Sequence, residues 1–333
     1  MSTRKKFFLA VTLAYIAFLI FPLFTTFSGL SISIVSIIAV AILIMASVIS
    51  GRSQTRSVEH DFSPFDAIEA SDGFKVSTSQ SDSYSVKLTV DDALESYVEC
   101  YVKAGTLHIG LDEKNVPRDL KKQYKGKNSG DPTLVAIVYM PSLKKLILND
   151  NSEFFNSSNL SGESFTLALN GTSKIADLKV VAKTIDIALT KNAKLTNANL
   201  SAEGDATINM DSKTTATLSC AAENLILTTA GSSDLTLSAN IEKKAVLYVS
   251  GTAKLTMSGS ANALEVNGKA TSAKIDAHAL QAETANLVVS GTSMSVAVAQ
   301  AIEFDLGKGT EVTYSGDPTV KIVKIQNASV LRE

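Results

Sequence analysis

The second half of the chain repeats itself at intervals of 20 residues. Written in rows of 20 from Met140, it places apolar residues in the same columns from row to row. Self-similarity at this period is the signature of a solenoid, and the alternation of apolar and polar residues inside each row is typical of half-buried strands. The sequence therefore predicts an all-β fold, a parallel β-helix with about 20 residues per coil. The main columns are Leu167, Ile187, Leu227, Leu247 and Leu287; Leu169, Leu189, Val249 and Val289; and Ile175, Leu195, Leu235, Leu255 and Ile275.

A recurrent glycine marks one corner of each predicted coil. It stands at Gly171, Gly231, Gly251 and Gly291, where a backbone that needs positive φ favours glycine. Lys191 and Asp211 take this place in two other rows, and Gly268 comes three places early in its own row, although the pattern recovers after it. Nine rows stacked at about 4.8 Å predict a rod roughly 40 Å long.

Two apolar blocks precede the repeats, at residues 7–27 and 30–49. Each is about 20 residues long, enough to cross a hydrocarbon core as a helix. We expect residues 1–50 to form a membrane anchor of two transmembrane helices. The alternative is a long signal peptide ending near Ser28, because Arg4, Lys5 and Lys6 form a basic N-terminal region. The length of the first block and the absence of a small-x-small cleavage site favour two spans.

Basic residues flank both outer ends of this predicted hairpin, and Arg52 and Arg56 follow it. The positive-inside rule then predicts an inner-membrane protein with both ends, and hence the solenoid, in the cytoplasm. The solenoid lies outside the cytoplasm only if one of the two apolar blocks does not cross the membrane or is removed by cleavage.

The remaining chain divides by composition. Residues 51–61 are a polar linker, residues 62–139 form irregular N-terminal coils and a cap, residues 140–319 form the regular coils, and residues 320–333 form a C-terminal cap. In the N-terminal part we expect strands near Ile68, Phe74, residues 84–90, residues 97–102 and residues 106–109. Asp91 is expected to start a helical turn as an acidic N-cap, and residues 112–131 a charged loop.

Short motifs of this region are similar to those of a known family. They read FDAIEASDGFKVSTSQ, KAGTLHIGL, VAIVYMPSLKKLILNDNSEF and, at the end, GTEVTYSGDPTVKIVKI. In this order they resemble the head GIN domain family, described as putative auto-transporter adhesins of Bacteroidetes-type bacteria. The resemblance covers about Phe62 to Val330. It implies a parallel β-helix in the envelope, on the periplasmic side or at the surface, and carries no catalytic motif.

Composition excludes several functions. The net charge of −2 gives no electrostatic footprint for nucleic acid. The lysines near Lys121 are interpreted as a solvated face. From residue 161 onward the aromatic residues are Phe165, Tyr248, Phe304 and Tyr314, so the rod has few of the platforms on which sugars stack. Cys100 and Cys220 alternate with polar residues as small buried hydrophobes do, and no Cys/His metal spacing occurs.

One column of charged residues could contain a pair of catalytic carboxylates. It contains the pairs Glu203/Glu223 and Glu283/Glu303, whose carboxylates would lie about 5 Å apart and could share a proton or a cation. The favoured interpretation is a solvent-facing charge ladder in which Glu163, Lys183 and Glu203, then Glu223 and Lys243, alternate in sign. A second column has the same character, with Lys174, Lys194, Asp234, Lys254 and Lys274.

We therefore expect no catalytic, cofactor-binding or metal-binding residues and no enzymatic activity. His60, His108 and His278 are scattered, without an orienting acid that the sequence identifies. The favoured function is a membrane-anchored β-helix that contacts the bilayer through residues 7–49. Its Ser/Thr/Asn/Lys-rich face would bind an envelope protein or surface polymer. The alternatives are a membrane-tethered cytoplasmic scaffold that self-associates end to end in the manner of bactofilins, and a carbohydrate-active β-helix enzyme.

Overall fold

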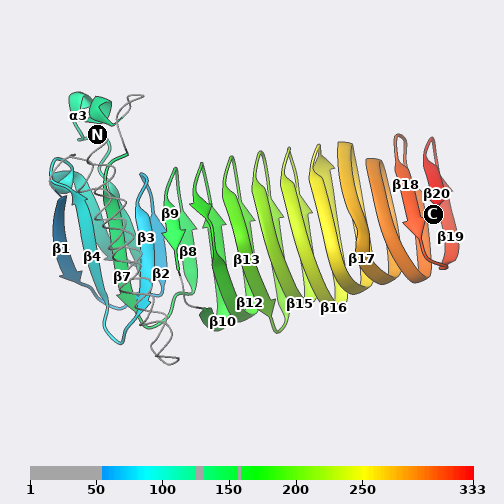
Figure 1. Cartoon of the computed structure of the whole chain (residues 1–333), viewed down its shortest axis with the longest axis horizontal. Helices are drawn as coiled ribbons and strands as arrows, with labels where there is room; N and C mark the ends of the chain where they lie inside the picture. Colours follow the sequence, from blue (N-terminus) through cyan, green and yellow to red (C-terminus); the bar gives the residue numbers. More distant parts are fainter. Residues whose placement is uncertain (1–54, 125–130, 157–158) are drawn as a thin grey trace, which may run out of the picture. The chain divides into compact units, whose positions relative to one another are not determined.

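The computed structural model describes residues 55–124, 131–156 and 159–333. The chain divides into two compact units, Met1–Ile44 and Met45–Glu333, and the described residues belong to the second. In this unit parallel strands stack coil upon coil along one axis (Figure 1). The predicted β-solenoid is therefore confirmed.

The regular coils contain strands that pair only with the coil before and the coil after. Neighbouring coils contribute equivalent strands, so that β10 lies on β12, β12 on β14 and β15 on β16. The strands are β8 (Lys145–Leu148), β9 (Glu153–Phe155), β10 (Leu160–Leu169), β11 (Lys174–Ile175), β12 (Leu178–Leu189), β13 (Lys194–Ala202), β14 (Asp205–Met210), β15 (Thr215–Thr229), β16 (Asp234–Gly251), β17 (Lys254–Leu306), β18 (Glu311–Ser315), β19 (Thr319–Ile325) and β20 (Ser329–Arg332).

The pairing register follows the 20-residue period and departs from it by single residues. Leu160 lies opposite Val180, and Val180 opposite Leu200, as the period requires. Ile187, however, lies opposite Ile208, which in turn lies opposite Leu227. Residues are gained and lost near the corners, so the interior columns stay continuous. In the column of Ile187 and Leu247, two rows of the sequence have no apolar residue at the position that the period predicts. Ile208 and Val266, each one residue away, take these places in the structure.

The apolar columns form one continuous core. Phe165, Leu167 and Leu169 of β10 are 2% exposed or less, and their partners in the next coil, Ile185 and Ile187, are equally buried. Burying a side chain of this size contributes about 1.5–3 kcal/mol relative to leaving it exposed. Because each side chain is covered by the coils on either side, a single coil cannot gain this energy by itself.

The predicted glycine corner has the expected backbone. Gly171, Gly231 and Gly251 have φ of 76°, 66° and 73°, and Lys191 adopts the same conformation at 65°. In the coil between them the left-handed residue is Ser212, at φ 68°, not the predicted Asp211. The corners also approach each other closely: a Cβ on Gly251 would lie 2.5 Å from the carbonyl oxygen of Gly231.

Several buried side-chain hydroxyl groups have no hydrogen-bond partner among the residues that the structure describes. Thr229 takes the place of an apolar residue between Met210 and Val249 in one interior column. Its side chain is 0% exposed, and its Oγ1 has no hydrogen-bond partner in the described residues. An unsatisfied buried hydroxyl is unfavourable. The column therefore tolerates this threonine at a cost in stability.

The N-terminal part closes one end of the solenoid. β2 and β3 stack in parallel on β8 and β9 as first strands of the coil, whereas β1 and β7 flank β4 in antiparallel pairing. Strands are found at all the positions predicted between residues 62 and 111, where they are β2 to β6, and β1 and β7 lie outside this range. The strands of the N-terminal part are β1 (Thr55–Asp61), β2 (Ala67–Ala70), β3 (Lys75–Gln80), β4 (Ser85–Asp91), β5 (Val98–Lys103), β6 (Thr106–Leu111) and β7 (Leu134–Met140).

Three local expectations differ from the structure. Residues 55–61 of the expected linker form β1, because β4 offers them a free edge. The charged loop contains a short helix, α3 (Arg118–Gln123), which begins directly after Pro117. The 3₁₀ turn η1 (Glu95–Tyr97) begins after Leu94, whose apolar side chain cannot cap it, rather than after Asp91. The carboxylate of Asp91 instead accepts a hydrogen bond from the Thr133 amide.

The transmembrane prediction requires correction. None of the helices in residues 55–124, 131–156 and 159–333 is long and apolar enough to cross a bilayer. α3 has six residues, about 9 Å against a hydrocarbon core of about 30 Å, and is largely charged. The two expected spans, residues 7–27 and 30–49, lie outside the described residues. The fold class of the described residues is therefore a β-solenoid, and the predictions of a transmembrane helix pair and of a two-span inner-membrane location are withdrawn.

Replacing Gly251 with alanine tests how tightly the corners pack. Gly251→Ala adds a Cβ both to a left-handed backbone and to a position 2.5 Å from a carbonyl oxygen of the coil below. Gly105→Ala is the matched control, since Gly105 has φ of 75° but nothing within 4 Å of its Cβ. We expect the control to lower the free energy of unfolding by about 1–2 kcal/mol. Gly251→Ala should cost about twice as much or more in chemical denaturation, and equal losses would contradict coil-to-coil packing as the cause.

Replacing Thr229 with valine tests the buried hydroxyl. Thr229→Val keeps the branched shape and removes the unpartnered group, so the free energy of unfolding should rise by about 1 kcal/mol. The control is Thr236→Val, on the exposed face of β16, which should change stability by less than about 0.5 kcal/mol. A loss of stability in Thr229→Val would show that the hydroxyl has a partner in solution.

Candidate functional site

The predicted charge ladder is present at one corner of the solenoid. Lys183 Nζ lies 2.6 Å from Glu163 Oε2, and Lys243 forms an ion pair with Glu223. The hydrogen bond and charge of Glu163, with the charge of Glu203 behind them, raise the pKa of Lys183 above its ordinary value. These side chains are exposed, so the ladder contributes little to stability. It matches the alternation of sign inferred from the sequence.

The members of the two possible carboxylate pairs interact mainly with other side chains. A shift of one residue places the Glu223 amide on the carbonyl of Gly204 rather than opposite Glu203. Glu283 accepts a hydrogen bond from Gln300 at 3.3 Å, and Glu303 pairs with Lys321 at 2.9 Å. Three of the four carboxylates thus bind a lysine or an amide. The arrangement offers no pair of acids poised for glycosidic chemistry.

The second charged column also follows the coils. Lys174 lies opposite Lys194 in the register and forms an ion pair of 2.7 Å with Glu153. Asp234 lies opposite Lys254. Thr215 fills the row that the sequence pattern left open between Lys194 and Asp234. This column forms one margin of a sheet face.

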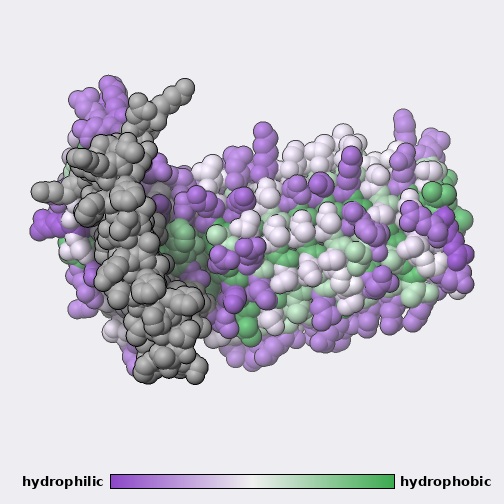
Figure 2. Space-filling view, viewed as in Figure 1, coloured by the Kyte–Doolittle hydropathy of each residue, from purple (hydrophilic) through white to green (hydrophobic). Residues whose placement is uncertain are grey.

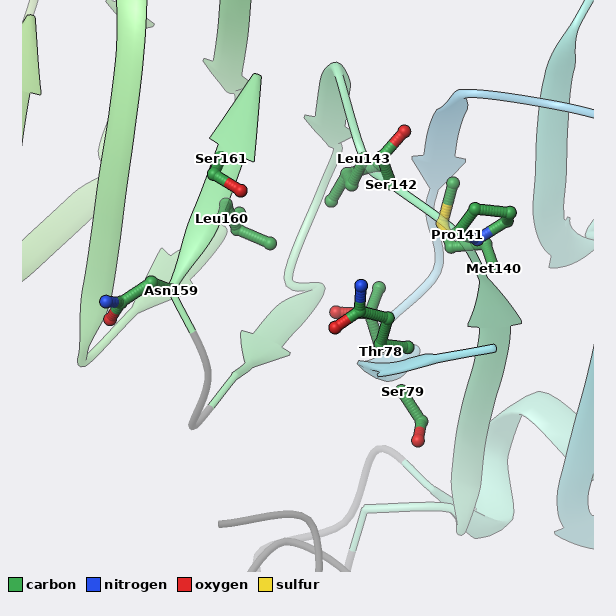
Figure 3. Close-up of a pocket in the computed structure, with 10 residues that line it drawn as sticks. Thr78, Ser79, Met140, Pro141, Ser142, Leu143, Asn159, Leu160 and Ser161 are labelled. Atoms are coloured by element: carbon green, nitrogen blue, oxygen red, sulfur yellow. The ribbon is translucent and has the colours of Figure 1, made fainter. Parts of the chain in front are cut away.

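Two hollows lie on the surface of the described residues. A small pocket of about 80 Å³ lies between the ends of β3 and β7 and the start of β10. The residues that line this pocket carry no charge; Figure 3 shows Thr78, Ser79 and Ser161 among them. A larger open groove of about 500 Å³ crosses several coils between Lys244 and Lys321. Both lysines are already paired there, with Glu265 and Glu303.

One polar cluster was missed by the sequence analysis. Tyr101 stacks on His108 with ring centroids 5.0 Å apart, and His108 Nδ1 lies 3.3 Å from Glu69 Oε2. Antiparallel pairing of β5 with β6 and parallel pairing of β6 with β2 bring them together. Their separation in the sequence left no periodic signal. Within the described residues, no three His, Cys, Asp or Glu side chains are close enough to hold a metal ion.

Both cysteines are free thiols that pack against the core. Cys220 is 2% exposed, and Cys100 is half-buried in β5. Burial raises the pKa of each thiol to about 12. Neither thiol is therefore a nucleophile near neutral pH, in agreement with the interpretation of Cys220 as a core residue.

The most regular surface is a grid of hydroxyl groups on the outward face of β15, β16 and β17. Alternate residues of each strand point outward, and the register aligns them from coil to coil. Neighbouring hydroxyls are about 4.8 Å apart between coils and about 6.6 Å apart along a strand. We call this surface the hydroxyl array; it consists of Thr217, Ser219, Thr236, Ser238, Thr256 and Ser258.

These hydroxyls are available to a ligand. Thr217, Thr236 and Ser238 are exposed, and the other members are partly exposed. In the part of the chain that the structure describes, none of their hydroxyl oxygens has a hydrogen-bond partner, whereas the neighbouring Ser260 donates to Asn240 at 2.9 Å. The sequence signal is a Thr-x-Ser triplet repeated at Thr217, Thr236 and Thr256. The uneven spacing of 19 and 20 residues obscured it.

An ionisable pair borders the array on the next coil. Asp276 Oδ1 lies 2.6 Å from His278 Nδ1 and accepts a hydrogen bond of 3.0 Å from Ser295. The hydrogen bond with Asp276, and then its charge, raise the pKa of His278. The same contact lowers the pKa of Asp276. The pair is exposed and sits where a polymer lying along the array would pass.

Comparison with known proteins identifies related sequences and structures. A family model described as "Putative auto-transporter adhesin, head GIN domain" matches residues 64–252 and 197–318. Similar structures include a putative adhesin of Parabacteroides distasonis ATCC 8503, at 17% identity over 85% of this chain and 98% of that one, with a TM-score of 0.47. A putative adhesin of Parabacteroides merdae ATCC 43184 has 17% identity over 84% and 96%, with a TM-score of 0.44. A search of curated proteins finds no match.

Titration of His278 tests the pair at the edge of the array. Since its pKa is raised in the folded chain, the ion pair with Asp276 stabilises the fold fully below the unfolded pKa of about 6.5 and is lost as pH rises through the folded pKa. We expect NMR titration to give His278 a pKa above that of an unperturbed histidine. Asp276→Asn should return it toward the ordinary value, with Asp305→Asn as a control on another coil. A His278 pKa unchanged by Asp276→Asn would contradict the contact.

Proposed function

This chain belongs to the head GIN domain family, and from that premise we propose that it is a non-enzymatic, adhesin-like module that binds a hydroxyl-rich polymer at the cell envelope or surface through its hydroxyl array. The observation that carries the proposal is the alignment of exposed, unpartnered hydroxyls in successive coils. A serine or threonine hydroxyl both donates and accepts hydrogen bonds. Such a grid is suited to a ligand that is itself a regular series of hydroxyl groups, as a polysaccharide is.

The strength of single contacts favours a polymer over a small sugar. Each hydrogen bond to the array contributes about 0.5–1.5 kcal/mol, so a ligand that reaches two or three hydroxyls gains about 1–4.5 kcal/mol. Association itself costs about 4–15 kcal/mol. A monosaccharide therefore does not bind well, whereas a chain that runs along the coils and meets many hydroxyls does.

The charged margins of the same face support this orientation. Asp234 and Lys254 flank the array in register with Thr236 and Thr256, and Asn240 and Ser260 continue it on the other side. These groups lie at the rim of the face, where charges select partners more than they add affinity. The face between these margins presents hydroxyls. A bound polymer would therefore lie along the long axis of the rod.

A binding experiment with insoluble polysaccharides tests the proposal. The full chain is mixed with a panel of such polymers, peptidoglycan sacculi included, and the sedimented fraction is measured. The triple variant Thr217→Val, Thr236→Val and Thr256→Val removes hydroxyls at constant shape, and its dissociation constant should rise at least about tenfold, the equivalent of about 1.4 kcal/mol. The matched control is Thr166→Val, Thr207→Val and Thr228→Val, on the sheet of β10, β14 and β15.

Two results would contradict the proposal. One is equal binding by the wild-type chain and the array variant to every polymer that sediments the protein. The other is an equal loss in the control variant, which would place the binding surface elsewhere. Circular dichroism and thermal melting of each variant establish that the coils remain folded.

A further inference from the structure

The last coil exposes the interior of the solenoid. β19 pairs with β17, and β20 pairs with β18; among the described residues neither strand has a partner along its other edge. Val320 and Ile322 lie in register on Ile302 and Phe304, and Ile325 lies on Leu306. They are therefore the final members of the core columns, and they end at solvent.

The change in exposure across one coil is large. Ile302, Phe304 and Leu306 are 1% exposed or less, whereas Ile322 is 61% exposed and the other two about 40%. Val323 and Leu331 add further exposed apolar surface, at 54% and 62%. Figure 2 shows green, hydrophobic residues at the end of the rod where Figure 1 draws β19 and β20. A contiguous apolar patch of this kind marks an interaction site.

The opposite end of the solenoid is unsuited to cover this patch. Among the described residues there, β1 and β5 each pair with a strand on one edge only. Most residues of β1 are polar or charged, including Arg56 and Glu59, and β5 carries Glu99 and Lys103. Arg56 is held by Glu95 at 3.0 Å. Packing the apolar end against β1 would remove these charges from water without supplying partners, which is unfavourable. A head-to-tail filament is thereby disfavoured.

The matching surface is the same end of a second copy. Its apolar columns would continue those of the first, and its free strand edge supplies the missing backbone hydrogen bonds. Of the charges at this end, Lys321 pairs with Glu303 at 2.9 Å and Arg332 with Asp317 at 2.8 Å, and Lys324 lies in register with Asp305. They remain at the rim, where water and their own partners reach them.

We propose that two copies of this chain join through their C-terminal ends, with β19 of each copy pairing antiparallel to β19 of the other across a two-fold axis. Such an interface uses the same patch twice and closes on itself, so it produces a dimer and stops. The inference does not depend on the hydroxyl array, which lies on other coils. The proposed assembly is a closed dimer, in contrast to the end-to-end scaffold considered from the sequence.

The mass of the full chain in solution tests the interface. Analytical ultracentrifugation over a concentration series should show a dimer for the wild type, and Ile322→Lys should raise the dissociation constant at least tenfold. The matched control is Ile226→Lys, an exposed apolar residue of β15 that is 43% exposed and distant from this end along the chain. It should leave the dissociation constant unchanged, and melting curves of both variants report whether the last coils stay folded.

Cross-linking tests the symmetry independently of any effect on stability. Ile322 is the central residue of β19, so a two-fold axis through the paired strands brings Ile322 of one copy against Ile322 of the other. Ile322→Cys should therefore form a disulfide-linked dimer under mild oxidation, whereas Tyr248→Cys, exposed on β16, should not. Wild-type chain that stays monomeric, or a dimer that survives Ile322→Lys and gives no cross-link, overturns the proposal. A ladder of higher oligomers abolished by Ile322→Lys overturns the two-fold arrangement.

Discussion

The whole structure depends on the fact that one coil cannot bury its own apolar side. Leu167, Ile187 and Leu227 are covered only because another coil lies above and below them. In the regular coils the hydrogen bonds between strands also join neighbouring coils. The interior register must therefore be kept from one end to the other. The corners absorb the differences in coil length, by a gained residue before Ile208 and a lost one after it.

This constraint explains what the sequence could and could not predict. The period, the columns and the glycine corner follow from interactions that repeat, so Cys220 and the Glu163–Lys183 contact were placed correctly. The offset of single residues depends on the local structure of each corner, and it shifts Glu223 out of register with Glu203, which the sequence had offered as a possible carboxylate pair. At the N-terminal end nothing repeats. The antiparallel pairing of β1 with β4, and the stacking of Tyr101 on His108, depend on tertiary contacts that a single sequence does not display.

The same constraint separates the inner and outer surfaces chemically. Inward positions are fixed by packing, whereas outward positions on the flat faces are free to take any side chain that tolerates a strand. Ion pairs fill the corners and part of the groove, as Lys244 and Glu265 do. The Thr-x-Ser triplets are different, because their hydroxyls form no hydrogen bond with a neighbour in the described residues and are therefore free to bind a ligand. The family relationship and these free hydroxyls are the two observations that support the proposed adhesin-like binding.

The tolerance of the corners to gained and lost residues has a consequence for how such a chain changes over generations. Because each coil touches only the next one, duplicating a stretch from one corner to the equivalent corner inserts a complete layer without disturbing either end. Each inserted layer would bring its own Thr-x-Ser triplet into line with Thr236 and Thr256. Copying a short segment of the gene could thus lengthen the surface that contacts a polymer, and the added coil would use the same core columns as its neighbours.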